Sequence, residues 1–219
     1  MPSSATRLAA QSVPVGLLTP REGVYSYATN GEEQVNRPSK TTHTYPSVSA
    51  GTVAGSTCDA HFTWQPIEGR RLDFGGCYDH GAFRLSSMTT TQTFFGYRNT
   101  LSYKCAGENV AMPAQPKAGA RWSFPCKSDK TQADVKMNVL EPVTRVIGGV
   151  KVATWHVRFA AVIAGGTRGT IGFDFWFAAR DALPIAIDSA TDVVEDTPFG
   201  AVHYVEAFSL ALARLQPQT

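Results

Sequence analysis

The side chains best suited to proton transfer or metal binding in this chain are its five histidines, because imidazole changes its charge near neutral pH. They are His43, His61, His80, His156 and His203. None belongs to an HExxH motif, and none lies at a spacing that indicates a metal site. His80 follows Asp79 in a turn, and His156 and His203 alternate with apolar neighbours as solvent-facing strand residues do. We therefore expect no metal site and no catalytic histidine.

Motifs of nucleophilic and phosphate-binding chemistry are also missing from the sequence. The chain has no GxSxG nucleophile elbow, no P-loop and no GxGxxG after a strand. Asp174 lies among aromatic residues in the stretch 173–177, but alternation along a strand turns its carboxylate to the other face. The sequence therefore assigns no catalytic residue and no cofactor, which favours a binding role over an enzymatic one.

Four cysteines allow three disulfide connectivities: Cys58, Cys77, Cys105 and Cys126. A hairpin around residues 66–69 would place Cys58 opposite Cys77, which leaves Cys105 to pair with Cys126. Each bond would close a loop of about twenty residues, worth about 3 kcal/mol in the chain-entropy model. The alternatives are a zinc site, which usually needs cysteine pairs two to four residues apart, and free buried thiols. We expect the two disulfides, and with them an oxidising compartment outside the cytosol.

The residues that we expect to bind a ligand are six aromatic side chains: Trp155, Phe159, Phe173, Phe175, Phe177 and Phe208. They lie between Val135 and Leu212, where four turn-forming segments separate five strands of an antiparallel meander. These turns are Ile147–Gly149, Ala164–Arg168, Arg180–Pro184 and Asp196–Gly200. Because successive side chains of a strand point to opposite faces, the register of each hairpin decides which residues share a face.

A turn centred on Gly166 predicts that Phe159 pairs with Phe173 and Trp155 with Phe177. The other expected pairs are Val157–Phe175, Met137–Phe159, Val139–Val157, Phe177–Ile187, Ala179–Ile185, Thr191–Tyr204, Val193–Val202 and Ile187–Phe208. All four registers give one apolar face and one polar face, which is typical of an antiparallel sheet with one dry side. Trp176 is an exception on the polar face, and Glu206 and Arg214 are charged exceptions on the apolar face of the last strand.

The N-terminal half also consists of short strand patterns separated by turns. The expected strands are residues 22–29, 50–56, 58–65, 70–77, 82–95, 100–105 and 121–126, with a loop and one short strand in 30–46 and a connection in 106–119. A bulge near Gly75 and Gly76 would bring the apolar residues of the 58–77 hairpin to one face. With no long helical pattern, we expect an all-β, mainly antiparallel fold: a long-stranded meander forming a curved sheet, half-barrel or barrel.

Length and charge limit the remaining possibilities. The 219 residues favour a single β-domain at 21–215, with a flexible N-terminal stalk at 1–20 and a C-terminal tail at 216–219. A net charge of +2 and the absence of a basic run exclude a general nucleic-acid binder. No apolar run is long enough to cross a membrane, and the first residues lack a signal-peptide pattern. A surface location would therefore require a targeting or anchor segment outside this sequence.

Three segments resemble uncharacterised extracellular domains of actinobacterial membrane-anchored proteins. They are Phe94–Gly96 leading to Cys105, Thr167–Thr170 leading to Leu183–Pro184, and Thr197–Gly200 leading to His203–Tyr204. The resemblance covers about Gly23 to Leu212 and implies an extracellular, membrane-anchored location without an activity. The meander is more distantly similar to the half-barrel of LolA- and LppX-like lipoprotein carriers, which implies an acyl-chain ligand. The chain departs from those carriers in having no predicted helices and no lipobox cysteine.

The apolar face must be covered, since each fully buried large side chain contributes about 1.5–3 kcal/mol. The N-terminal strands can pack over it, the sheet can curl around it, or it can line a cavity for a hydrophobic ligand. We expect a cell-envelope domain that binds a hydrophobic or lipid-like molecule and lies near a membrane through an anchor outside the sequence. The alternative is an extracellular structural or protein-interaction module whose apolar face is an ordinary core; no particular protein partner is indicated.

Overall fold

The structure is a computed structural model that describes residues 18–55, 57–107, 109–197 and 200–218. Residues 1–17 of the expected stalk lie outside this described part. Within it the chain forms fourteen β-strands and no helix, which confirms the predicted all-β class. The strands are β1 (Gly23–Val35), β2 (Thr41–Thr44), β3 (Val48–Ala54), β4 (Ala60–Ile67), β5 (Arg70–Asp79), β6 (Ala82–Phe94), β7 (Tyr97–Cys105), β8 (Val110–Met112), β9 (Arg121–Lys127), β10 (Thr131–Ile147), β11 (Val150–Gly165), β12 (Thr167–Ala178), β13 (Pro184–Thr197) and β14 (Gly200–Leu212).

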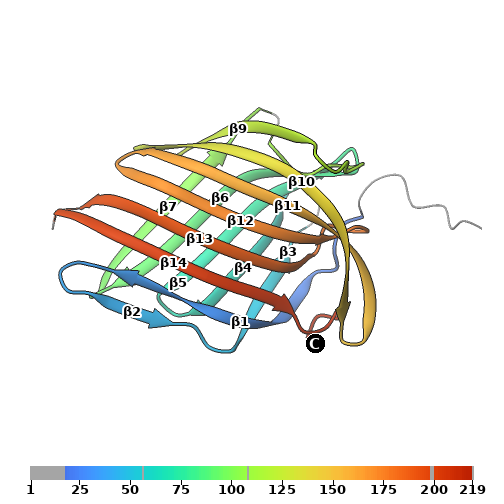
Figure 1. Ribbon diagram of the computed structural model, residues 1–219, viewed down its shortest axis with the longest axis horizontal. Coiled ribbons are helices and arrows are strands. Elements are labelled where there is room, and N and C mark those ends of the chain that lie inside the picture. Colours follow the sequence, from blue (N-terminus) through green and yellow to red (C-terminus); the bar gives the residue numbers. More distant parts are fainter. Residues whose placement is uncertain (1–17, 56, 108, 198–199, 219) are drawn as a thin grey trace, which may run out of the picture.

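The strands close into a ring because the first strand pairs with the last. β1 pairs with β3 along Gly23–Ala28 and with β14 along Tyr27–Val35. The other strands pair mainly in chain order, but β7 and β9 share only two residue pairs, one of which is Cys105–Cys126. The ring is therefore not a regular barrel. Figure 1 shows β10–β14 crossing over β4–β7, so that the ring is flattened into two facing layers.

The first two registers of the meander are confirmed. In β11–β12, Phe159 pairs with Phe173, Trp155 with Phe177 and Val157 with Phe175. In β10–β11, Met137 pairs with Phe159 and Val139 with Val157 as predicted. The turn of this second hairpin is nevertheless shorter than expected, since Ile147 pairs with Val150 around Gly148 and Gly149, which both have positive φ. A register shift between Val139 and Pro142 restores the predicted pairing farther along the strands.

The two later registers were each wrong by two residues. Phe175, not Phe177, pairs with Ile187, because the Ala182 N–H donates to the Ala178 carbonyl and closes the turn earlier than predicted. In β13–β14 the observed pairs are Val193–Tyr204, Thr191–Glu206 and Ile187–Leu210. The turn between these strands includes residues 198–199, which lie outside the described part. A shift of two keeps every side chain on its face, so the predicted apolar face is unchanged.

The N-terminal strands differ from the expectation in length. β1 continues through the polar residues 30–35, where a loop was expected, because β14 and β2 pair with its two edges. The expected bulge at Gly75–Gly76 occurs in the pairing of β5 with β6. In β4–β5 the register shift lies between Trp64 and Ile67 instead, and it places Trp64 opposite Leu72. The short strand β8 interrupts the predicted 106–119 connection.

Both predicted disulfides are present. Cys58 is bonded to Cys77, and Cys105 to Cys126. The zinc and free-thiol alternatives are therefore wrong. The second disulfide lies where β7 meets β9, so it fastens the most weakly paired position of the ring. Disulfides form and persist in oxidising compartments, and the two bonds indicate such an environment for this chain.

The N-terminal layer covers the apolar face of the meander. Phe74 lies edge-on to Phe173 and Phe175, with ring centroids 5.3 and 5.5 Å apart, and Trp64 lies 4.2 Å from Phe208. Of the residues paired on this face, Trp155, Ala179 and Val202 are half-buried and the others are buried. Arg214 is exposed because β14 ends at Leu212.

The first and last described segments of the chain meet at the start of β1. In the expected C-terminal tail, the Gln218 N–H donates to the carbonyl of Val24 at 2.7 Å, and the Gln216 side chain accepts from Arg21 at 3.0 Å. In the described part of the chain, no helix is long and apolar enough to cross a membrane.

Candidate functional site

A buried ion pair crosses the interior of the ring. Glu206, the charged exception on the last strand, is 2% exposed and accepts two hydrogen bonds from Arg70: from Nε at 2.7 Å and from Nη2 at 2.8 Å. Arg70 also donates to the Thr90 hydroxyl, and Tyr45 donates to Glu206. Burial acts to lower the pKa of Arg70, but the Glu206 carboxylate raises it well above its ordinary value. The guanidinium is therefore charged and almost fully hydrogen-bonded.

A second carboxylate lies beside this pair. Glu33 is 0% exposed, and its Oε2 accepts from the Tyr204 hydroxyl at 2.8 Å and lies 3.9 Å from Arg70 Nε. Its Oε1 is 3.0 Å from Nδ1 of His43, a part-exposed residue that stacks on Phe94 at 4.4 Å. Burial raises the pKa of Glu33, and its hydrogen bonds to His43 and Tyr204 lower it in part. Two carboxylates thus share one buried guanidinium in what we call the charged layer: Glu33, Tyr45, Arg70, Tyr204 and Glu206.

A cavity of about 300 Å³ lies next to the charged layer, toward the turn that joins β13 and β14. Its apolar wall comes from β1, β6, β7, β13 and β14 and includes Val35, Phe94, Leu101, Val193 and Val202. Tyr204 borders the cavity with its ring while its hydroxyl reaches into the charged layer. A volume of this size lies at the lower end of the range for small-molecule sites, and such sites are mostly apolar with a few polar groups.

The polar groups of this cavity lie on β6, β7 and β13. Gln92, Asn99 and Glu195 line it, and the Asn99 amide donates to Glu195. Burial raises the pKa of Glu195, and the bond from Asn99 lowers it in part. Arg37 contributes an exposed positive charge to the cavity lining.

A smaller space of about 30 Å³ lies beside both the cavity and the charged layer. It is lined by Arg70 and Glu206 from the layer, and it shares Gln92, Leu101 and Tyr204 with the larger cavity. Both spaces lie along the edge of β7 that faces away from β6. Over residues 98–103, this edge of β7 pairs with no strand of the described chain. The interior of the ring is therefore least filled where its wall is least complete.

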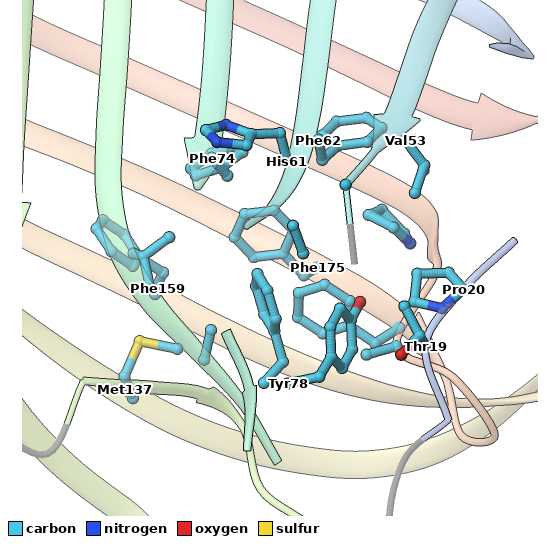
Figure 2. Close-up of a pocket in the computed structure, with 18 residues that line it drawn as sticks. Thr19, Pro20, Val53, His61, Phe62, Phe74, Tyr78, Met137, Phe159 and Phe175 are labelled. Atoms are coloured by element: carbon cyan, nitrogen blue, oxygen red, sulfur yellow. The ribbon is translucent and has the colours of Figure 1, made fainter. Parts of the chain in front are cut away.

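The opposite end of the ring is more tightly filled. Figure 2 shows aromatic side chains from both layers, among them Phe62, Phe74, Tyr78 and Phe175, converging on one apolar space. Thr19 and Pro20 border this space, whose volume is about 40 Å³. That is room for a few water molecules at most, so the rings themselves occupy the centre of this end.

The structure separates the six aromatic residues predicted to bind a ligand. Phe159, Phe175 and Phe177 line the narrow apolar space, Phe173 borders the space beside the charged layer, Phe208 packs on Trp64, and Trp155 lines none of these spaces. None of the six lines the 300 Å³ cavity. Sequence reasoning missed the residues of this cavity because they come from six strands; the alternation of Leu101 and Tyr103 was the available signal.

His43 reaches the buried Glu33 and His61 borders the narrow apolar space, whereas His156 and His203 lie on the outside of the ring. His156 is 2.6 Å from Asp174 and stacks on Trp176, and His203 is 2.7 Å from Asp192. Asp174 points outward, as alternation predicted. Each pair joins neighbouring strands on the surface, and among the described residues no group of three or more His, Cys, Asp or Glu is arranged to hold a metal ion. We find no arrangement at these histidines that favours catalysis.

Comparison of the chain with models of known protein families, with curated proteins and with solved structures finds no match. The resemblances to actinobacterial extracellular domains and to lipoprotein carriers therefore stay predictions.

Proposed function

We propose that this domain binds a small hydrophobic or lipid-like molecule in the 300 Å³ cavity beside the charged layer. The observation that carries the proposal is an apolar cavity of that size inside a ring whose other end is filled by its own side chains. Protein interiors are normally close-packed, with few voids larger than a water molecule. A cavity large enough for a ligand is therefore a feature that needs an occupant, and its walls select an apolar one.

The proposal moves the ligand away from the middle of the meander face. There, Phe173 and Phe208 contact Phe74 and Trp64 of the opposite layer and leave little space. Toward the end of β13 and at the start of β14, Val193 and Val202 face a hollow instead. The same aromatic face thus serves as core in the centre, while its continuation toward the turn lines the binding site.

The location belongs to the same proposal. Two disulfides support an oxidising environment, and we propose that the domain lies in the extracellular cell envelope. An anchor outside this sequence would hold it near a membrane, where lipid-like ligands are abundant.

Filling the cavity tests the function. Val202→Trp places a large ring in the cavity, while Val162→Trp adds the same ring at a 56% exposed position on the outside of β11. We expect native mass spectrometry to show a bound dodecyl compound with the wild-type protein and with Val162→Trp, but not with Val202→Trp. Circular dichroism melting curves check that both variants fold. If no apolar compound binds the wild type, the domain is a structural or protein-interaction module.

A further inference from the structure

Two buried polar atoms beside the cavity have no hydrogen-bond partner in the described chain. They are Oε1 of Gln92 and the hydroxyl of Tyr103, a residue that is 0% exposed. Gln92 lines both the large cavity and the smaller space, and Tyr103 lines the smaller one. The other described atoms of this kind belong to residues that line neither space. Because buried polar groups are nearly always hydrogen-bonded, these two atoms lack a partner that the structure would normally supply. Both are closed off from the cavity in this conformation, so a ligand reaches Gln92 Oε1 only after the amide turns toward the cavity.

The charges around the cavity decide what that partner can be. Glu195 lines the cavity, and Glu33 and Glu206 lie just beyond Tyr204, whereas Arg70 is the one buried cation of the charged layer and is already engaged. A further carboxylate at the inner end would meet three acidic groups, and the other cation that lines the cavity, Arg37, is exposed and does not belong to the charged layer. Like charges in a poorly solvated site disfavour each other strongly. An anionic head group is therefore unsuited to this end of the cavity.

We infer that the ligand is an uncharged amphiphile whose hydroxyl group enters the cavity first and hydrogen-bonds with Gln92, while its apolar chain extends along Phe94 and Val202. The ligand hydroxyl can donate to the Gln92 side-chain carbonyl oxygen. It can also accept a hydrogen bond from the Tyr103 hydroxyl, either directly or through a water molecule. This inference rests on the proposed function and specifies the ligand class as long-chain alcohols and related neutral lipids. It distinguishes them from fatty acids of the same length.

Matched ligands test the inference. Dodecanol, dodecanoate and dodecyl methyl ether share one chain, but only dodecanol is both uncharged and able to donate a hydrogen bond. We expect wild-type protein at neutral pH to bind dodecanol at least about tenfold more tightly than dodecanoate, as measured by displacement of a fluorescent apolar dye.

Matched variants complete the test. Gln92→Leu should weaken dodecanol about two- to tenfold, the range that the net value of one hydrogen bond allows, and should leave the ether unchanged. Gln132→Leu, at an exposed position on β10, is the control and should alter neither.

The possible failures are distinguishable. Equal or tighter binding of dodecanoate, lost in Arg37→Gln, would show an anionic head group at Arg37 and overturn the inference while the proposed function stands. Dodecanol binding that Gln92→Leu does not weaken would assign Gln92 to a bound water molecule and also overturn it. If none of the three compounds binds, the proposed function itself fails.

Discussion

Removing Arg70 is the sharpest test of the charged layer. In Arg70→Met, Glu206 loses two charge-assisted hydrogen bonds, and Glu33 loses the cation that lies 3.9 Å away. Both carboxylates stay buried, at 2% and 0% exposure. Breaking a buried ion pair by removing one partner costs about 3–5 kcal/mol, and two carboxylates depend on this one. We therefore expect a loss of about 5 kcal/mol, or a fall in Tm of about 10–20 °C for a chain of this size.

Urea denaturation followed by tryptophan fluorescence measures this loss. The control is Arg168→Met, which breaks the exposed pair with Asp196 and should cost less than about 1 kcal/mol. In the triple variant Arg70→Met/Glu206→Leu/Tyr45→Phe, about half of the lost stability should return. Glu206 and the Tyr45 hydroxyl that donated to it are gone, but Glu33 stays buried without its cation. A cost for Arg70→Met no larger than that of the control would refute the view that this layer is dry.

Three further predictions address the pH response, the weakly paired junction of β7 and β9, and the core of the ring. Burial raises the pKa of Glu33, so its proton uptake stabilises the fold as the pH falls through that raised value. The stability of wild type minus that of Glu33→Gln should therefore decrease as the pH rises above about 4 in urea titrations, and a constant difference would contradict this. Replacing Cys105 and Cys126 by serine should lower the free energy of unfolding by about 2–5 kcal/mol. Hydrogen exchange should become faster in β9 far more than in β12, since only two residue pairs join β7 to β9. Equal acceleration in both strands would be evidence against a weak β7–β9 junction. Phe74→Ala should lower the free energy of unfolding by about 3–5 kcal/mol, because Phe74 packs between the two layers. Phe95→Ala, at a 55% exposed residue, should lower it by less than about 1 kcal/mol. Thermal melts that rank the two variants the other way would contradict this packing.

Local patterns in the sequence were sufficient for the strands and their faces. Alternation of side chains has a period of two in any strand, so Phe159, Phe173 and Phe175 share a face whatever lies opposite them. The β11–β12 register followed from the glycines at 165 and 166, because a short loop leaves few ways to pair the strands beside it. The same locality gave the Cys58–Cys77 disulfide, since one hairpin brings these two residues together.

Turn details were harder to predict, because they depend on single backbone hydrogen bonds. The bond from Ala182 N–H to the Ala178 carbonyl moved the β12–β13 pairing by two residues, and nothing in the residue types required it. Errors of two residues left the faces intact, which explains why the predicted apolar face survived two wrong registers.

The charged layer and the cavity were decided by the tertiary structure alone. Arg70 and Glu206 are 136 positions apart, and Glu206 by itself was only an exception in an apolar pattern. The pair forms because β1 closes the ring against β14, which brings three distant strands around one interior. The sequence determines which side of each strand is dry, since that depends on neighbours along the chain. Whether the dry sides meet as a filled core or leave a cavity depends on how the strands cross, and only the closed ring decides that.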